Sequence, residues 1–351
     1  MRPAISGIGD VTEEFLSTAL ADRLGNAAVT AVTATPIGTG QVSDSYRLHL
    51  TCDGPADVPR TLVAKVPAAD PASRAAARAF RTYEIEASFY DELAQGLPVA
   101  LAGCYYAGYD AGPDEYIVLL EDLSPATPGD QLAGLSEDDA AAAVDELAAL
   151  HAAGWNSPEL AALPWLNRSS PEANALMTAA LTGLYPGFRD RYAAALDPGA
   201  VTLIEDFLPH ADGYFSASAE PCTIVHGDYR ADNLLFGGPR PAVLDWQTCS
   251  FGHATSDLSY FLGSSLPVAG RREHEEALVR RYHAALTHRG VGLTLADCWD
   301  GYRLRAFSGI VMDVIAAMVV QQTERGDKMF AAMANRHARH AIDLDALALI
   351  R

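Results

Sequence analysis

The stretch of residues 224–236, I-V-H-G-D-Y-R-A-D-N-L-L-F, constrains this chain more than any other part of its sequence. Apolar residues at both ends predict two short strands, and the polar residues between them predict a loop. The loop holds Asp228, with Asn233 five positions later, and an apolar run at 242–246 brings Asp245 twelve positions after Asn233. We therefore expect these three side chains to come from adjacent turns of one hairpin.

The spacing matches the D-x-x-x-x-N loop and the later Asp of protein-kinase-like enzymes. Phosphoryl transfer needs an acceptor hydroxyl aimed in line with the γ-phosphorus, and cations that neutralise the phosphate oxygens. A carboxylate at Asp228 can orient that hydroxyl and accept its proton. Asn233 and Asp245 supply the oxygen donors that Mg²⁺ prefers. The sequence thus predicts Asp228 as catalytic base and Asn233 and Asp245 as magnesium ligands.

A purely structural interpretation of this region is also available. H-G-D could be a turn that caps a helix or strand, and Asp245 could simply end a strand. The joint occurrence of all the elements at these spacings favours the kinase interpretation. His226 is expected to support the loop. Arg230 is a second candidate catalytic residue, because it could reach the γ-phosphate, with a scaffold or solvent-exposed role as the alternative.

These motifs resemble those of the aminoglycoside phosphotransferase and choline kinase-like superfamily, and in detail its ecdysteroid kinase-like branch. That branch shows H-G-D-x-x-x-x-N followed by an Asp-Trp pair, here Asp245-Trp246. The resemblance implies that Asp257, in the G-x-x-x-x-D-L pattern of residues 252–258, holds the catalytic loop. It also implies a kinase-like α+β fold of two lobes, with Mg²⁺ as cofactor and ATP or GTP as co-substrate.

Gly38, Gly40 and Ser43 lie between two predicted strands, as the nucleotide loop of kinase-like folds does. Small residues there let backbone N–H groups and a hydroxyl approach the phosphates. A plain hairpin turn is the alternative for this segment. No Gly-Lys-Ser/Thr follows, so it is not a Walker A loop, and a Rossmann loop would open a helix rather than a strand.

Lys65, in the apolar segment L-V-A-K-V of residues 62–66, fits the lysine that pairs with the α- and β-phosphates. A lone lysine in a strand usually faces outward, so a partner is needed. The next helix carries Glu84 and Glu86, and a helix glutamate holds that lysine in the kinase fold. The family's Glu-x-x-Phe-Tyr pattern favours Glu86.

Glu121 and Leu123 end the segment Y-I-V-L-L-E-D-L of residues 116–123, which resembles the strand and hinge between the lobes. Their backbone groups would hydrogen-bond the edge of adenine. The alternating apolar residues of the strand could equally be core.

The periodicity along the chain predicts a small antiparallel sheet with helices, followed by a larger mainly helical region. We expect an N-lobe of residues 1–122 that binds nucleotide and a C-lobe of 123–351 that holds the catalytic loop and binds the acceptor, with the nucleotide between them. The predicted strands are 29–35, 43–50, 61–66, 101–109 and 116–120, and the main predicted helices are 12–24, 73–93, 137–153 and 303–320.

The formal net charge of −20 disfavours a nucleic-acid partner, since a phosphate backbone is bound by a basic face. It could attract a cationic substrate, although solubility is the simpler explanation. No stretch approaches a membrane span of about 20 apolar residues, and the N-terminus has no signal-peptide pattern. We expect a cytoplasmic protein without a membrane partner.

Two further features have simple interpretations. The five cysteines are scattered, without a C-x-x-C pair, and are expected to be reduced and mostly buried. His337 and His340, in R-H-A-R-H, have helical spacing, but they lack an evident acidic or cysteine partner. A solvated helix face is favoured over a metal site there.

The predicted function is therefore a small-molecule kinase that phosphorylates a hydroxyl of its acceptor. An antibiotic kinase acting on aminoglycosides or macrolides would use the same machinery. A nucleotide-binding pseudokinase with a regulatory role is the alternative from another class, but it should lack a catalytic element. A protein kinase is disfavoured because no Ala-Pro-Glu segment is present and Asp257 follows Asp245 by only twelve residues. The sequence leaves open the acceptor, the choice of ATP or GTP, and the oligomeric state.

Overall fold

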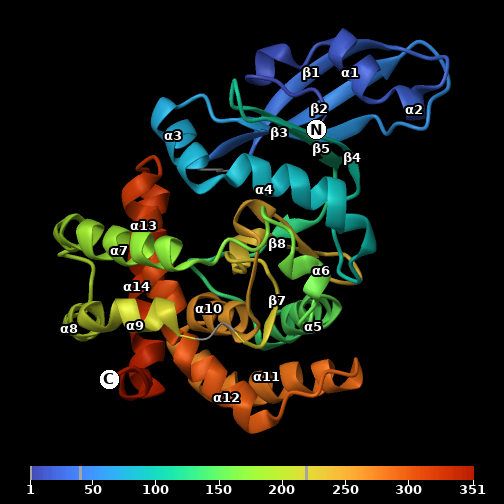
Figure 1. The fold of residues 1–351 in the computed structure, drawn as a ribbon. Coiled ribbons are helices and arrows are strands. Elements are labelled where there is room, and N and C mark those ends of the chain that lie inside the picture. Colours follow the sequence, from blue (N-terminus) through green and yellow to red (C-terminus); the bar gives the residue numbers. More distant parts are fainter. Residues whose placement is uncertain (1, 39–41, 218–219) are drawn as a thin grey trace. The chain divides into compact units, whose positions relative to one another are not determined.

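The computed structural model describes residues 2–38, 42–217 and 220–351, and they form two compact units (Figure 1). The first unit comprises Met1–Leu97, Leu101–Pro125 and Asp245–Thr248. The second unit comprises Pro98–Ala100, Ala126–Leu244 and Cys249–Arg351. Asp245 therefore belongs to the first unit, although the residues that precede it in the sequence belong to the second.

A five-stranded antiparallel sheet is the framework of the first unit. Its order across the sheet is β1-β2-β3-β5-β4, so the apolar strands β3 and β5 are central and almost wholly buried. All five predicted strands are confirmed, with shifted ends. They are β1 (Val29–Ile37), β2 (Ser43–Cys52), β3 (Thr61–Pro67), β4 (Cys104–Asp110) and β5 (Glu115–Glu121).

The helix predicted at 12–24 forms as two short helices, α1 (Glu13–Ala19) and α2 (Ala21–Leu24), with a break at Leu20. Thr12 is the N-cap, because its hydroxyl accepts the N–H of Phe15 at 3.1 Å. Gly25 follows the end of α2 with a φ of 59°, a conformation that glycine adopts without strain.

The single helix predicted at 73–93 is also divided. It forms α3 (Pro71–Phe80), α4 (Thr82–Ser88) and a π-helical turn at Phe89–Leu93. Arg81 separates α3 from α4 because it adopts a left-handed φ of 59°, which interrupts the helical hydrogen bonds. Its guanidinium then pairs with Glu84 at the start of α4. The helix that carries Glu86 is therefore α4 alone.

The second unit is mainly helical, which confirms the predicted α+β class. Two small antiparallel sheets accompany its helices. The strands are β6 (Thr127–Pro128), β7 (Cys222–Val225), β8 (Leu234–Phe236), β9 (Ala242–Val243) and β10 (Ser250–His253). The helices are α5 (Glu137–Ala153), α6 (Pro158–Ala161), α7 (Pro171–Arg191), α8 (Pro198–Phe207), α9 (Ala211–Ser216), α10 (Thr255–Ser265), α11 (Val268–His288), α12 (Leu295–Leu304), α13 (Ser308–Val319) and α14 (Glu324–Asp343).

Two of the helical predictions for this unit can be compared directly. The helix at 137–153 is confirmed at both ends as α5, which Ser136 caps by accepting the N–H of Asp139. The helix at 303–320 is wrong in part. α12 ends at Leu304, a 3₁₀ turn follows at Arg305–Phe307, and α13 begins only at Ser308.

All five cysteines are free, but the expectation that most are buried is wrong. Cys249 and Cys298 are buried, whereas the other three are half-buried. Burial raises the pKa of the Cys104 thiol to about 12, which keeps even this half-buried group protonated at neutral pH.

No helix in the described part of the chain is both long enough and apolar enough to cross a membrane.

Candidate active site

Lys65, Glu86 and Asp245 meet in the first unit, although they come from β3, α4 and the segment Asp245–Thr248. The Lys65 ammonium donates to Glu86 Oε1 at 2.6 Å and to Asp245 Oδ1 at 2.9 Å. The Lys65 side chain is 11% exposed and that of Glu86 is 0% exposed. By contrast, Glu84 pairs with Arg81. The first unit thus holds a buried cation between two carboxylates.

The charges of this trio stabilise one another. Burial alone would lower the pKa of the Lys65 ammonium, but the negative charges of Asp245 and Glu86 outweigh it and raise the pKa. Tyr116 of β5 donates its phenolic O–H to the other oxygen of Glu86. Lys65 is therefore a fixed cation at neutral pH.

The neighbours of Asp245 explain how its segment joins the first unit. Trp246 is fully buried and stacks on Phe89, with ring centroids 4.0 Å apart and planes at 8°. Gln247 donates to the Ser43 hydroxyl at 2.8 Å. Asp245 itself has a left-handed φ of 64°, an uncommon conformation for a residue other than glycine. Packing of the next residue therefore holds Asp245 in a strained backbone state.

The structure locates the remaining residues predicted to bind nucleotide as follows. Gly38 follows β1 with a φ of 70°, and Ser43 begins β2 and is buried. Gly40 lies outside the described residues. Glu121 ends β5, and its backbone N–H donates to the Gly103 carbonyl at 2.7 Å. Leu123 follows β5 and is half-buried.

Asp122, between Glu121 and Leu123, is engaged by Arg47 of β2. The guanidinium donates to both carboxylate oxygens, at 2.7 and 3.1 Å. Burial would raise the pKa of Asp122, but the hydrogen bond and charge of Arg47 outweigh it and lower the pKa. The chain after β5 is thereby tied to the sheet.

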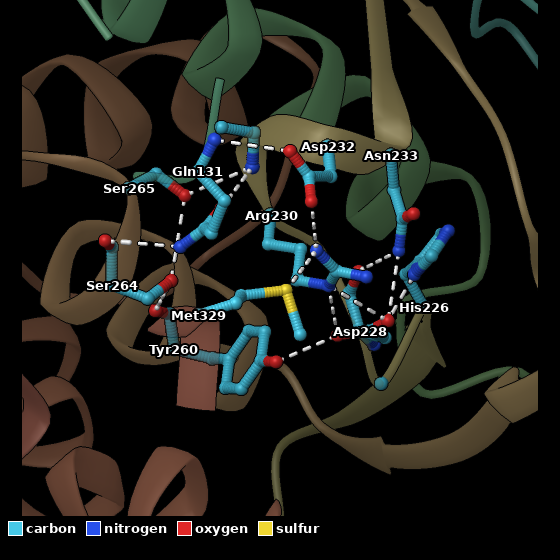
Figure 2. Close-up of polar contacts among 12 residues, drawn as sticks. Gln131, His226, Asp228, Arg230, Asp232, Asn233, Tyr260, Ser264, Ser265 and Met329 are labelled. Carbon is cyan, nitrogen blue, oxygen red and sulfur yellow. Dashed lines mark hydrogen bonds and ion pairs between the residues drawn. The ribbon is translucent and has the colours of Figure 1, made fainter. Parts of the chain in front are cut away.

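In the second unit, the Asp228 carboxylate is surrounded by hydrogen-bond donors (Figure 2). The Tyr260 hydroxyl donates to Oδ1 at 2.6 Å, and Asn233 Nδ2 donates to Oδ2 at 2.8 Å. Arg230 Nε lies 3.0 and 3.1 Å from the two oxygens. The side chain of Asp228 is still 20% exposed. This carboxylate is therefore oriented by its partners and still accessible.

The amide of Asn233 has only one possible orientation. Its Nδ2 donates to the Asp228 main-chain oxygen and to Asp228 Oδ2, both at 2.8 Å. Because a carbonyl and a carboxylate only accept, the nitrogen must face them and Oδ1 must face elsewhere. Asn233 Oδ1 is therefore the atom that can coordinate a hard cation.

Arg230 is an internal partner of the loop as well as a candidate catalyst. Besides Asp228, it donates from Nη1 to Asp232 Oδ2 at 3.0 Å and to the Met329 sulfur at 3.4 Å. Burial would lower its pKa, but the charges of Asp228 and Asp232 raise the pKa further above its ordinary value. Within the described part of the chain, Nη2 of Arg230 has no hydrogen-bond partner. This nitrogen can donate to an anionic oxygen.

The backbone that directly precedes Asp228 is held by Asp257 of α10. Its carboxylate accepts the N–H of His226 at 2.6 Å and of Gly227 at 2.9 Å, and it lies 3.3 Å from His151 Nε2. The His226 ring bridges to the Leu244 carbonyl through Nε2 and accepts the Asp228 N–H at Nδ1. Asp257 and His226 thus have the supporting positions expected of them.

The reasoning from sequence missed Tyr260 and misjudged His337 and His340. Both histidines are fully buried, so the expectation of a solvated helix face is wrong. His337 Nδ1 lies 2.7 Å from Asp313 Oδ2, and His340 Nε2 lies 2.8 Å from the Tyr302 hydroxyl. The partners come from α13 and α12, and no local pattern in the sequence predicts contacts between these helices and α14.

A cluster of three or more histidine, cysteine or acidic side chains able to hold a metal is not found among the described residues. This does not conflict with a magnesium site. Mg²⁺ is commonly held by one or two protein oxygens together with phosphate groups and water. Asn233 Oδ1 and the Asp245 carboxylate, 37% exposed, have the donor chemistry that such an ion requires.

A lysine held by a helix glutamate, an aspartate and asparagine on one loop, and a following Asp-Trp pair together define a phosphotransferase of kinase-like fold. The model of the phosphotransferase enzyme family (APH) matches residues 33–294. This chain belongs to that family.

Solved structures show the same fold. A Ralstonia eutropha protein provisionally described as an aminoglycoside phosphotransferase is 18% identical, with a TM-score of 0.55, and the alignment covers 97% of this chain and 99% of that one. The choline kinase of Cryptosporidium parvum is 10% identical, with a TM-score of 0.53 and coverage of 97% and 92%. These similarities confirm the predicted fold.

A curated relative matches a shorter stretch. Acyl-CoA dehydrogenase family member 11 of Rattus norvegicus is 42% identical over 89 residues, which make up 23% of this chain. The match spans only 10% of the length of that protein.

Proposed function

We propose that this protein is a small-molecule kinase that transfers the γ-phosphoryl group of ATP or GTP to a hydroxyl of its acceptor. The observation that carries the proposal is the Asp228 carboxylate, oriented by donors on both oxygens and still partly exposed. In the step, the acceptor oxygen forms a bond to the γ-phosphorus, the bond from that phosphorus to the β-γ bridging oxygen breaks, and the hydroxyl proton passes to Asp228.

The other residues have roles that follow from their chemistry. Lys65 binds the α- and β-phosphates, and Glu86 fixes its position. The backbone at Gly38 and Gly40 and the Ser43 hydroxyl approach the phosphates. Backbone groups of Glu121 and Leu123 hydrogen-bond the nucleobase of ATP or GTP. Arg230 donates to the γ-phosphate through Nη2. These assignments complete the proposed nucleotide site.

Asn233 and Asp245 are the proposed magnesium ligands. Bound magnesium would neutralise charge on the phosphate oxygens as the phosphoryl group transfers.

Finer assignments are also proposals. The Asp245-Trp246 pair supports a place for this protein in the ecdysteroid kinase-like branch. The proposed enzyme acts in the cytoplasm on a hydroxylated small molecule. The pseudokinase alternative is disfavoured because Lys65, Glu86, Asp228, Asn233 and Asp245 are all present. An antibiotic acceptor uses the same machinery, and only the choice of acceptor separates it from a metabolic one.

The test is magnesium-dependent consumption of ATP and GTP with a panel of aminoglycosides, macrolides, sugars, amino alcohols and steroids. Asp228→Asn should lower kcat by about 10²–10⁴-fold, the usual contribution of a positioned general base, with nucleotide affinity nearly unchanged. Withdrawal of magnesium should abolish turnover.

Asp145→Asn is the matched control for this variant, because Asp145 is exposed and pairs with Arg281 in the same unit. It should retain wild-type kcat. Near wild-type turnover by Asp228→Asn would exclude Asp228 as the base. Tight nucleotide binding without turnover on any acceptor would favour the pseudokinase.

A further inference from the structure

Tyr260 makes the shortest described contact with the Asp228 carboxylate. Its hydroxyl lies 2.6 Å from Oδ1, and the residue is only 3% exposed (Figure 2). Burial raises the pKa of the Tyr260 phenol well above its ordinary value, so the group stays protonated at neutral pH. Because the carboxylate can only accept, Tyr260 is the donor in this hydrogen bond.

The direction of this bond matters for the orientation of the carboxylate. The terminal torsion of an aspartate is broad, so the plane of its oxygens is set by their partners. Tyr260 holds Oδ1, whereas Asn233 holds Oδ2 at 2.8 Å. Arg230 Nε is shared almost equally, at 3.0 and 3.1 Å, and does not distinguish the two oxygens. Tyr260 and Asn233 together therefore define which lone pairs remain directed toward an incoming hydroxyl.

Tyr260 is itself fixed from behind by His337 of α14. The two rings lie 5.2 Å apart with planes at 31°, and His337 Nε2 lies 3.2 Å from the Tyr260 carbonyl oxygen. His337 Nδ1 lies 2.7 Å from Asp313 Oδ2. Hydrogen bonds at both ring nitrogens leave the His337 ring one orientation. The hydroxyl of Tyr260 is thus held by a chain of contacts through α10, α14 and α13.

A pair of glycines provides the room for this arrangement. A Cβ atom at Gly309 would lie 2.2 Å from His337 Nε2, and one at Gly263 would lie 2.8 Å from its Cδ2. Both distances are far below van der Waals contact, so the backbones of α10 and α13 can lie this close to the ring at these two positions only because side chains are absent there. The packing around His337 is therefore closely fitted.

We propose that Tyr260 is a positioning residue for the base Asp228, and that His337 and Asp313 hold Tyr260 in place. This inference rests on the proposed function, because Tyr260 acts through Asp228 and not on the substrate directly. A merely structural tyrosine would affect folding and leave the catalytic step unchanged. The two cases differ in whether removal of the Tyr260 hydroxyl alone lowers kcat.

The decisive variant is Tyr260→Phe, which keeps the ring on His337 and removes only the donor to Asp228. Its matched control is Tyr302→Phe. Tyr302 is also a buried phenol of the second unit, and it donates to a carboxylate, Glu275 Oε1, at 2.7 Å. Tyr260→Phe loses the hydrogen bond to Asp228, whereas Tyr302→Phe loses the one to Glu275 and also the contact of its hydroxyl with His340 Nε2 at 2.8 Å, so the melting temperature of Tyr302→Phe should fall at least as far.

We expect Tyr260→Phe to lower kcat by about 10- to 100-fold, the scale expected when a reacting group is misplaced by a fraction of an ångström to an ångström. The KM values for nucleotide and acceptor should stay within about twofold of wild type, since no substrate contact is lost. Tyr302→Phe should retain wild-type kcat. In the Asp228→Asn background, Tyr260→Phe should have little further effect, because the group through which it acts is absent.

The outcomes separate this inference from the proposed function. Active wild-type enzyme, an impaired Asp228→Asn variant and equal kcat for the two phenylalanine variants would overturn the role of Tyr260 alone. A raised KM with unchanged kcat for Tyr260→Phe would also overturn it, since that would indicate contact with substrate. Near wild-type turnover by Asp228→Asn would overturn the proposed base, and the role of Tyr260 with it.

Discussion

The two units place charge at their centres in opposite ways. In the first unit a cation, Lys65, lies between the carboxylates of Glu86 and Asp245. In the second unit an anion, Asp228, lies among the donors Tyr260, Asn233 and Arg230. The central charge of the first unit is the more buried of the two, because the Lys65 side chain is 11% exposed and that of Asp228 is 20% exposed.

The difference indicates which property each centre serves. A buried charge depends on its partners, because desolvation is costly unless opposite charges lie close by. A partly exposed carboxylate held by hydrogen bonds keeps its solvation and has lone pairs left for a substrate. We therefore expect loss of the central charge to cost the first unit stability and the second unit turnover.

The largest effect on stability is expected from Lys65→Met. It leaves Glu86, which is 0% exposed, without its cation, and breaking a buried ion pair in this way costs about 3–5 kcal/mol. Urea denaturation followed by circular dichroism measures the loss. Lys328→Met is the matched control, since Lys328 pairs with Glu324 on an exposed helix face and should change stability by at most about 0.5 kcal/mol.

If Lys65→Met and Lys328→Met unfolded at the same urea concentration, the stability of the first unit would not depend on the buried charge of Lys65. Replacement of both Lys65 and Glu86 by methionine should recover much of the stability lost in Lys65→Met, because the unpaired buried carboxylate of Glu86 is then absent.

An intermediate effect is expected where the second centre is supported from behind. Gly309→Ala adds a methyl group 2.2 Å from the His337 ring and should lower the free energy of unfolding by about 1–3 kcal/mol, as overpacking does. Because His337 holds Tyr260, kcat should fall as well. Thermal unfolding and steady-state kinetics measure the two effects.

Gly183→Ala provides the contrast, because Gly183 lies within α7 and its Cβ would meet no atom within 4 Å. This change should stabilise the protein by about 0.5–1 kcal/mol, since alanine is the better helix former. Equal effects at the two glycines would show that the space around His337 is not needed.

The two centres also differ in how much of them the sequence could predict. Asp228, Arg230, Asp232 and Asn233 lie within six positions, so one loop motif identifies the polar core of the second centre. Lys65, Glu86 and Asp245 are far apart in the chain, and only the resemblance to a family linked them. Motifs of short range therefore reveal loop chemistry well.

The contacts that hold Asp228 through Tyr260, Asp313 and His337 could not be predicted from a local motif. Tyr260, Asp313 and His337 come from three helices, and each looks ordinary in its own segment. The sequence shows no acidic or cysteine partner for His337, and a solvated face was therefore favoured, yet the neighbouring Arg336 donates to the carbonyls of Gln131, Leu132 and Ser264. Such contacts depend on how helices pack, which local periodicity does not encode.

The smallest effect is expected at the rim of the second centre. Arg325 donates to both oxygens of Asp232, each at 3.0 Å, but its side chain is 43% exposed. Asp232 also accepts from Arg230 and from the backbone of Gln131, so it keeps partners after Arg325→Ala. Loss of one exposed ion pair should cost about 0.2–1 kcal/mol and change kcat by less than about twofold.

Salt should affect the exposed ion pair of Arg325 and the buried charge of Lys65 differently. An exposed pair is screened by ions, so the stability difference between Arg325→Ala and wild type should shrink as salt rises from low to about 1 M, whereas that of Lys65→Met should persist. Parallel thermal melts at the two ionic strengths measure both. A tenfold fall in kcat on Arg325→Ala would instead mean that this guanidinium contacts the acceptor, and the charged part of the second centre would then extend beyond the loop itself.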